Sequence, residues 1–162
     1  MAGDTLILGV GNPLCGDDAV GIRAVEALLQ RDDLPPEVAV IDGGTEGIGL
    51  IPLMESYRRV ILVDAAQMSL PPGAIRRFRW QDAEFAAHER ALSLHQSDLS
   101  DALALAAALR CLPQEVVIYV VQPHTMGWDQ PLSRAVERAL PALIEALINE
   151  ARSNSNGEDS DH

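Results

Sequence analysis

The chain contains no lysine, since all 12 of its basic residues are arginine in a sequence of 162 residues. This absence excludes mechanisms that need a lysine amine, including Schiff-base chemistry, the phosphate-binding lysine of P-loop proteins and a lysine general base. Acidic residues outnumber the arginines and leave a formal net charge of −12. That charge argues against nucleic acid and anionic membrane surfaces as partners.

Cysteines and long apolar runs are also scarce. Cys15 and Cys111 are the only cysteines, too few for a disulfide-stabilised scaffold, and they fit a reduced cytosolic protein. No apolar stretch approaches the roughly 20 residues of a membrane-spanning helix, and the first residues do not resemble a secretory leader. We therefore expect a cytoplasmic protein outside the membrane. The acidic surface and the lack of a coiled-coil pattern favour a monomer.

Apolar runs typical of buried strands alternate with helical patterns along the chain. We predict strands over 5–10, 37–42, 59–64, 74–80 and 115–121, and helices over 18–31, 48–56, 98–110 and 131–152. This alternation predicts a three-layer α/β fold, in which helices cover both faces of a five-stranded, mostly parallel twisted sheet. We expect residues 1–152 to form a single domain and the polar, acidic segment 153–162 to be a disordered tail.

The fourth predicted strand has to run antiparallel to its neighbour. The link between Asp64 and Ala74 contains two prolines and a glycine, and it is shorter than the dozen or so residues that a parallel crossover needs. Arg77 and Arg79 alternate along this strand, as suits an edge that must resist self-pairing. Numbering the five strands in chain order, we expect the order 2-1-3-5-4. The ends of strands 1 and 3 then border a crevice where open α/β sheets bind ligands.

Acidic residues follow three of these strands. Asp17 and Asp18 follow the first strand in a glycine-rich turn, Asp42 closes the second, and Asp64 closes the third. We expect Asp17 to cap the helix that follows it, and Asp18, Asp64 and His95 to converge in the crevice. Two carboxylates and an imidazole suit a divalent ion such as Zn²⁺ or Ni²⁺ and leave coordination positions open.

Two other α/β interpretations account for these residues less well. A dinucleotide site needs a third glycine where this chain has Leu14, and the paired acids would repel a pyrophosphate. A phospho-receiver domain has a comparable set of acids but needs a lysine after the last strand, where Gln122-Pro123 stands. That alternative predicts phosphorylation of Asp64.

Taken together, the motifs resemble those of the [NiFe]-hydrogenase maturation endopeptidases. The matching segments are Gly9-Val-Gly-Asn-Pro-Leu-Cys-Gly-Asp-Asp-Ala-Val-Gly21, Asp42-Gly-Gly-Thr-Glu-Gly47, Val63-Asp-Ala65, Ser93-Leu-His-Gln96 and Pro131-Leu-Ser-Arg-Ala-Val-Glu-Arg-Ala-Leu-Pro141. The resemblance extends from the first strand to about Leu147. Many members have Glu-Pro where this chain has Gln122-Pro123, so an acidic role at that position does not carry over.

The resemblance implies a protease that removes a short C-terminal extension from the large-subunit precursor of a [NiFe] hydrogenase after nickel insertion. It places metal contacts at Asp18, Asp64 and His95, and we take Asp18 and Asp64 as the catalytic candidates. The substrate loop would comprise Asp42, Gly43, Gly44 and Thr45. Nickel would be supplied by the nickel-loaded precursor, and a resident zinc stays an alternative. The same residues would also serve a non-proteolytic, nickel-dependent hydrogenase assembly factor.

Overall fold

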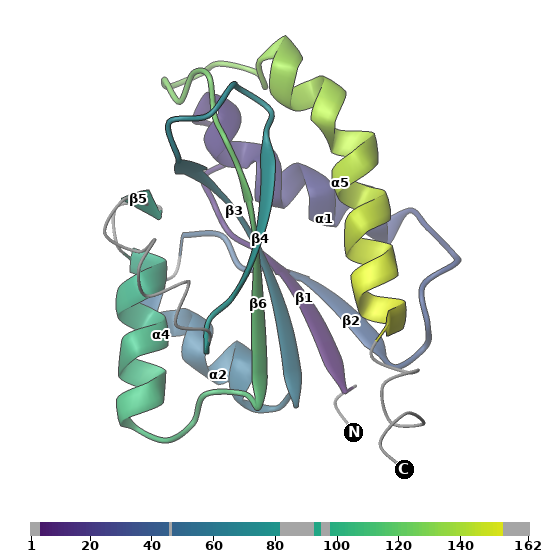
Figure 1. Ribbon diagram of the computed structural model, residues 1–162, viewed down its shortest axis with the longest axis vertical. Helices are drawn as coiled ribbons and strands as arrows, with labels where there is room; N and C mark the ends of the chain where they lie inside the picture. The colour runs from purple at the N-terminus through teal and green to yellow at the C-terminus, as the bar shows by residue number, and fades with distance from the viewer. Residues whose placement is uncertain (1–3, 46, 82–92, 95–97, 154–162) are drawn as a thin grey trace.

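The computed structural model describes residues 4–45, 47–81, 93–94 and 98–153. Its strands are β1 (Thr5–Gly9), β2 (Val38–Asp42), β3 (Arg59–Gln67), β4 (Ile75–Arg79), β5 (Ser93–Leu94) and β6 (Glu115–Val121) (Figure 1). Its helices are α1 (Val20–Leu29), α2 (Leu50–Glu55), α4 (Asp98–Ala108) and α5 (Arg134–Ser153), with the short 3-10 helices η1 (Gly16–Ala19) and η2 (Gly47–Gly49). Within the described residues, no helix has both the length and the apolar character required to cross a membrane.

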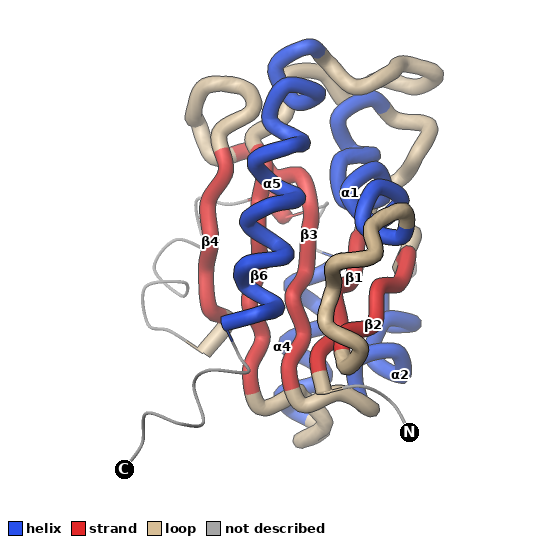
Figure 2. The backbone as a smooth tube through the Cα atoms, turned by 90° about the vertical axis from the view of Figure 1, so that its right-hand side faces the viewer, coloured by secondary structure: helices blue, strands red, loops and turns tan. Residues whose placement is uncertain are grey.

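The strands form a sheet in the order β2-β1-β3-β6-β4, and β5 pairs with β3 outside this path. The pairs β1–β2, β1–β3 and β3–β6 are parallel, whereas β4 runs antiparallel to β6. This topology confirms the predicted strand order and the antiparallel edge strand. Helices α1 and α5 cover one face of the sheet, and α2 and α4 cover the other (Figure 2).

The central strands are apolar on both alternations because helices bury both of their faces. In β3, Val60 and Leu62 belong to the core formed with α2 and α4, whereas Ile61 and Val63 belong to the core formed with α1 and α5. The strand is buried from Arg59 to Ala66. A carboxylate within this strand, Asp64, is therefore held in the interior.

Glycines bring the first strand and the first helix into direct contact. A side chain at Gly9 would collide with the carbonyl oxygen of Gly21, and a side chain at Gly21 would collide with that of Val63. Gly11 has a φ of 142° and approaches the carbonyl oxygen of Asp18 in the same way. Because only glycine permits these approaches, η1 lies against β3 at the ends of the central strands.

Several boundaries differ from those predicted. The first helix begins as η1 and continues as α1. Strand β3 continues past Asp64, and its last two residues pair with Ser93 and Leu94 of β5. A two-residue strand has no hydrophobic period, so β5 gave no signal in the sequence. Ser153, predicted as the start of the tail, is the last residue of α5, and residues 154–162 lie outside the described part of the chain.

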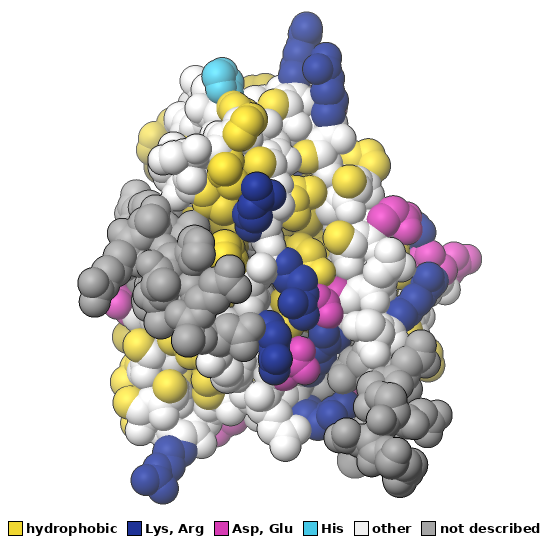
Figure 3. All heavy atoms as spheres, viewed as in Figure 1, with side chains coloured by type: hydrophobic (Ala, Val, Ile, Leu, Met, Phe, Trp, Pro, Cys, Tyr) yellow, Lys and Arg dark blue, Asp and Glu magenta, His cyan; other side chains and the backbone are white. Residues whose placement is uncertain are grey.

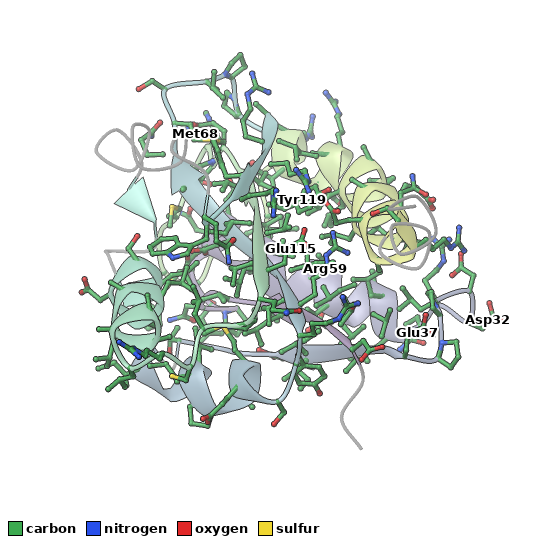
Figure 4. The ribbon with its side chains drawn as sticks, turned by 60° about the horizontal axis from the view of Figure 1, so that its bottom comes forward. Asp32, Glu37, Arg59, Met68, Glu115 and Tyr119 are labelled. Atoms are coloured by element: carbon green, nitrogen blue, oxygen red, sulfur yellow. The ribbon has the colours of Figure 1, made fainter. Side chains whose placement is uncertain are left out.

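A buried ionic cluster joins the end of α5 to the sheet. Glu150 accepts hydrogen bonds from Arg59, from Arg77 and, at 2.9 Å, from the hydroxyl of Tyr119. Figure 4 shows Arg59 and Tyr119 beside α5. Arginine and acidic side chains lie side by side over β4 and α5 in Figure 3. Burial alone would raise the pKa of Glu150, but the hydrogen bonds from Arg77, Tyr119 and Arg59 outweigh it and hold the pKa below its ordinary value.

The lowered pKa of Glu150 predicts a pH-dependent contribution to stability. A carboxyl group whose pKa is lowered by folding stabilises the folded state at pH values above its ordinary pKa of 4.5. That contribution is lost as the pH falls through the lowered pKa of the folded state. Glu150→Gln should therefore lower the free energy of unfolding by about 3 kcal/mol at pH 7. The difference from wild type should shrink below about pH 4.5. Urea denaturation between pH 7 and pH 3 measures both effects.

The matched control for this prediction is Glu55→Gln, which alters an exposed glutamate on α2. It should follow the wild-type profile at every pH. A constant difference between Glu150→Gln and wild type down to pH 3 would contradict the expected loss of the ionic interaction.

Candidate active site

The two adjacent aspartates of η1 have different environments. The carboxylate of Asp17 is completely buried and accepts four hydrogen bonds from distant parts of the chain. The donors are the backbone amides of His124 (2.7 Å), Thr125 (3.0 Å) and Ser133 (2.7 Å), and the Ser133 hydroxyl (2.8 Å). Neither η1 nor α1 has a side-chain cap, so the predicted capping role of Asp17 is wrong. Asp17 instead fastens η1 to the segment between β6 and α5.

Asp18 and Asp64 lie at the same end of the sheet, as predicted. Asp18 is 3% exposed, and one of its oxygens accepts the backbone N–H of Asn12 at 2.9 Å. Asp64 is completely buried, and its Oδ1 accepts the N–H of Ala65 at 2.8 Å. The segment that follows β1 is joined to β3 through Val10, whose N–H donates to the carbonyl of Val63 at 2.9 Å. The structure therefore holds two buried carboxylates at the carboxyl ends of neighbouring parallel strands, where α/β sheets place their ligands.

The Asp42–Thr45 segment follows β2 at this same end. Asp42 accepts the N–H of Gly44 at 2.8 Å, and Gly44 has a φ of 56° with open space where a side chain would stand. A cavity of about 490 Å³ adjoins the segment, lined by Ile41, Asp42, Gly43, Gly44, Gly49 and Leu53. The segment therefore lies beside a cavity large enough for side chains of a bound peptide.

Gln122 organises the loop that follows β3, a role that the sequence did not reveal. Its side-chain oxygen accepts the N–H groups of Met68 at 2.7 Å and Leu70 at 3.3 Å. Its amide nitrogen donates to the side chain of Gln67 at 2.7 Å and to the carbonyl of Pro123 at 3.1 Å. A glutamate could accept the first pair of bonds but could not donate the second. Glutamine is thus matched to the contacts at this position.

The third predicted metal contact, His95, lies outside the described residues. Within the part of the chain that the structure describes, no group of three His, Cys, Asp or Glu side chains is placed to hold a metal ion. The carboxylates of Asp18 and Asp64 nevertheless provide oxygen donors of the kind that divalent cations accept. His124 contacts Asp17, the residue before Asp18, through its backbone N–H, and its side chain is exposed.

Comparison with known proteins identifies the family of this chain. A protein-family model described as hydrogenase maturation protease matches residues 22–150. The chain belongs to the hydrogenase maturation protease family. Members of this family are peptidases, and the buried carboxylates of Asp18 and Asp64 lie at the end of the sheet where the sequence placed the site.

Individual relatives of this maturation protease agree with the family assignment. The chain is 33% identical over 144 residues to the hydrogenase 2 maturation protease of Escherichia coli, covering 88% of this chain and 87% of that protein. It is 32% identical to the hydrogenase expression/formation protein HupD of Rhizobium leguminosarum, covering 91% of this chain and 74% of that protein. The structure of the hydrogenase maturating endopeptidase HybD from Escherichia coli superimposes with a TM-score of 0.81, at 33% identity and 93% coverage of both chains.

Proposed function

We propose that this protein removes the C-terminal extension from the large-subunit precursor of a [NiFe] hydrogenase after nickel has been inserted. The observation that carries the proposal is the position of Asp18 and Asp64, two buried carboxylates at one end of the sheet in a chain of this family. The nearby Asp42–Thr45 segment and its cavity supply a surface for the peptide to be cut.

Peptide hydrolysis at this site requires a base and a proton donor. In the proposed mechanism, the carboxylate of Asp18 or Asp64 takes a proton from water as the water oxygen attacks the scissile carbonyl carbon. The carbon–nitrogen bond then breaks, and the same carboxyl group returns the proton to the leaving amine.

Nickel enters this proposal as part of the substrate. Asp18 and Asp64 would contact nickel that is already held by cysteines of the precursor, with His95 as the third contact. Strand β5 pairs with the end of β3, where Leu94 lies opposite Ala66, two residues after Asp64. His95 directly follows Leu94 in the sequence. Two carboxylates and an imidazole form a donor set suited to a borderline divalent ion, nickel or zinc. Such an ion supplies Lewis acidity toward a carbonyl or water.

The proposal is tested by incubating the purified protein with large-subunit precursor, with and without nickel loading, and weighing the products by mass spectrometry. We expect a shortened large subunit and a released C-terminal peptide only from the nickel-loaded precursor. Cleavage of both forms would reject the requirement for nickel but retain the peptidase. A precursor that binds when nickel-loaded and stays intact would favour the assembly factor.

A further inference from the structure

Three large apolar side chains are exposed on two loops at the same end of the molecule as Asp18. Trp128 is 71% exposed, Leu14 57% and Met126 43%. Leu14 lies between β1 and η1, and the other two lie between β6 and α5. Figure 1 shows both of these connections at one end of the fold. We call these three residues the Trp128 patch. Single exposed apolar side chains are ordinary, but three on adjoining loops need an explanation.

The two loops are bonded to each other along their length. The N–H of Asp129 donates to the carbonyl of Leu14 at 2.7 Å, that of Gly16 to Gln130 at 3.1 Å, and that of Asp17 to Thr125 at 2.7 Å. The buried carboxylate of Asp17 adds its bonds to the same loop. The patch is therefore held in place before any partner arrives, which lowers the entropy cost of binding through it.

One of the two loops that carry the patch contacts the candidate active site. The loop that carries Leu14 begins at Asn12, whose N–H donates to the carboxylate of Asp18 at 2.9 Å. One short segment, residues 12–18, thus carries both Leu14 of the patch and Asp18.

We infer that the Trp128 patch is a docking surface for the folded body of the large-subunit precursor, an inference that rests on the proposed function. The loop segments 12–16 and 125–128 contain no charged residue in a chain whose net charge is −12, and the exposed Asp129 directly follows Trp128. A second copy of the chain, or an anionic membrane, would be repelled by that charge. A different protein with an apolar recess can bury the three apolar side chains, and tryptophan is among the residues most enriched at the energetic centres of interfaces.

The test compares Trp128→Ala with Leu109→Ala, which removes an apolar side chain of similar exposure (63%) just after α4. Nickel-loaded precursor is the probe, and Kd, KM and kcat are measured for both variants and the wild type. We expect Trp128→Ala to raise Kd and KM about 30-fold, with kcat changed less than about twofold. Leu109→Ala should match the wild type, and thermal unfolding should be the same for all three proteins.

Failure of this inference is distinguishable from failure of the proposed function. If the wild type cleaves the precursor and Trp128→Ala binds it equally well, the docking surface is wrong and the peptidase stands. If the wild type binds the precursor without cleaving it, the peptidase proposal fails. The ratio of the Kd of Trp128→Ala to that of the wild type then still tests whether the patch is a docking surface. A wild type that neither binds nor cleaves overturns both. Sedimentation that shows a dimer lost in Trp128→Ala would identify the patch as a self-association surface and also overturn the inference.

Discussion

Cleavage of the nickel-loaded precursor should fall at least about 100-fold in Asp18→Asn or in Asp64→Asn, whichever residue is the general base, because general-base catalysis contributes a factor of this size or more. Asparagine has nearly the same shape as aspartate and keeps an oxygen to accept the N–H groups of Asn12 and Ala65. It cannot accept a proton from water at neutral pH. Initial rates of product formation, followed by mass spectrometry, measure the loss.

Asp101→Asn is the matched control, since it makes the same chemical change at an exposed position on α4. Its rate should equal that of the wild type. Thermal unfolding of the Asp18 and Asp64 variants shows whether they are folded at the assay temperature. A folded Asp18→Asn protein with a wild-type rate would exclude Asp18 as a catalytic residue, and the same reasoning applies to Asp64.

Asp17→Asn should be damaging for a different reason, by reducing the stability of the fold. Three backbone N–H groups and a hydroxyl converge on the buried carboxylate of Asp17. An asparagine would present an NH₂ group to some of these donors, and each buried donor left unsatisfied costs about 1–3 kcal/mol. We expect a loss of about 3–5 kcal/mol in the free energy of unfolding. For a chain of this size that corresponds to a fall of roughly 10 °C in Tm.

Asp129→Asn provides the comparison for this effect. Asp129 is exposed on the loop between β6 and α5 that Asp17 anchors, and it has a φ of 56°. Asparagine also adopts this conformation readily. This variant should unfold within about 0.5 kcal/mol of wild type, as exposed substitutions usually do. Urea denaturation of both proteins gives the comparison, and an Asp17→Asn protein as stable as Asp129→Asn would contradict the anchoring role of Asp17.

The contrast between Asp17 and Asp18 follows from where their partners come from. Both residues lie in η1 and both are buried. The carboxylate of Asp17 bonds groups that are 107 to 116 residues away in sequence, whereas Asp18 bonds Asn12 in its own turn. The sequence predicted a structural role for Asp17 and a place in the site for Asp18, but it assigned Asp17 a helix cap and could not identify its distant partners.

The sequence by itself determined the layers, the strand order and the end of the sheet where the acids gather. Buried parallel strands are apolar on both faces, so the runs in β1, β3 and β6 are recognisable from composition alone. The short link after Asp64 fixed the direction of β4, because a parallel crossover needs more residues than the link contains. The glycine and aspartate motifs fixed the family resemblance, which the comparisons confirm.

Only the tertiary structure decided the contacts between distant polar groups. Asp17 with Ser133, Gln122 with Met68, and Arg59 with Glu150 are separated by 116, 54 and 91 residues. Hydrophobic burial repeats with the period of a helix or strand and leaves a pattern in the sequence. A hydrogen bond between two single side chains has no period, and its geometry exists only after the packed core has brought the two residues together.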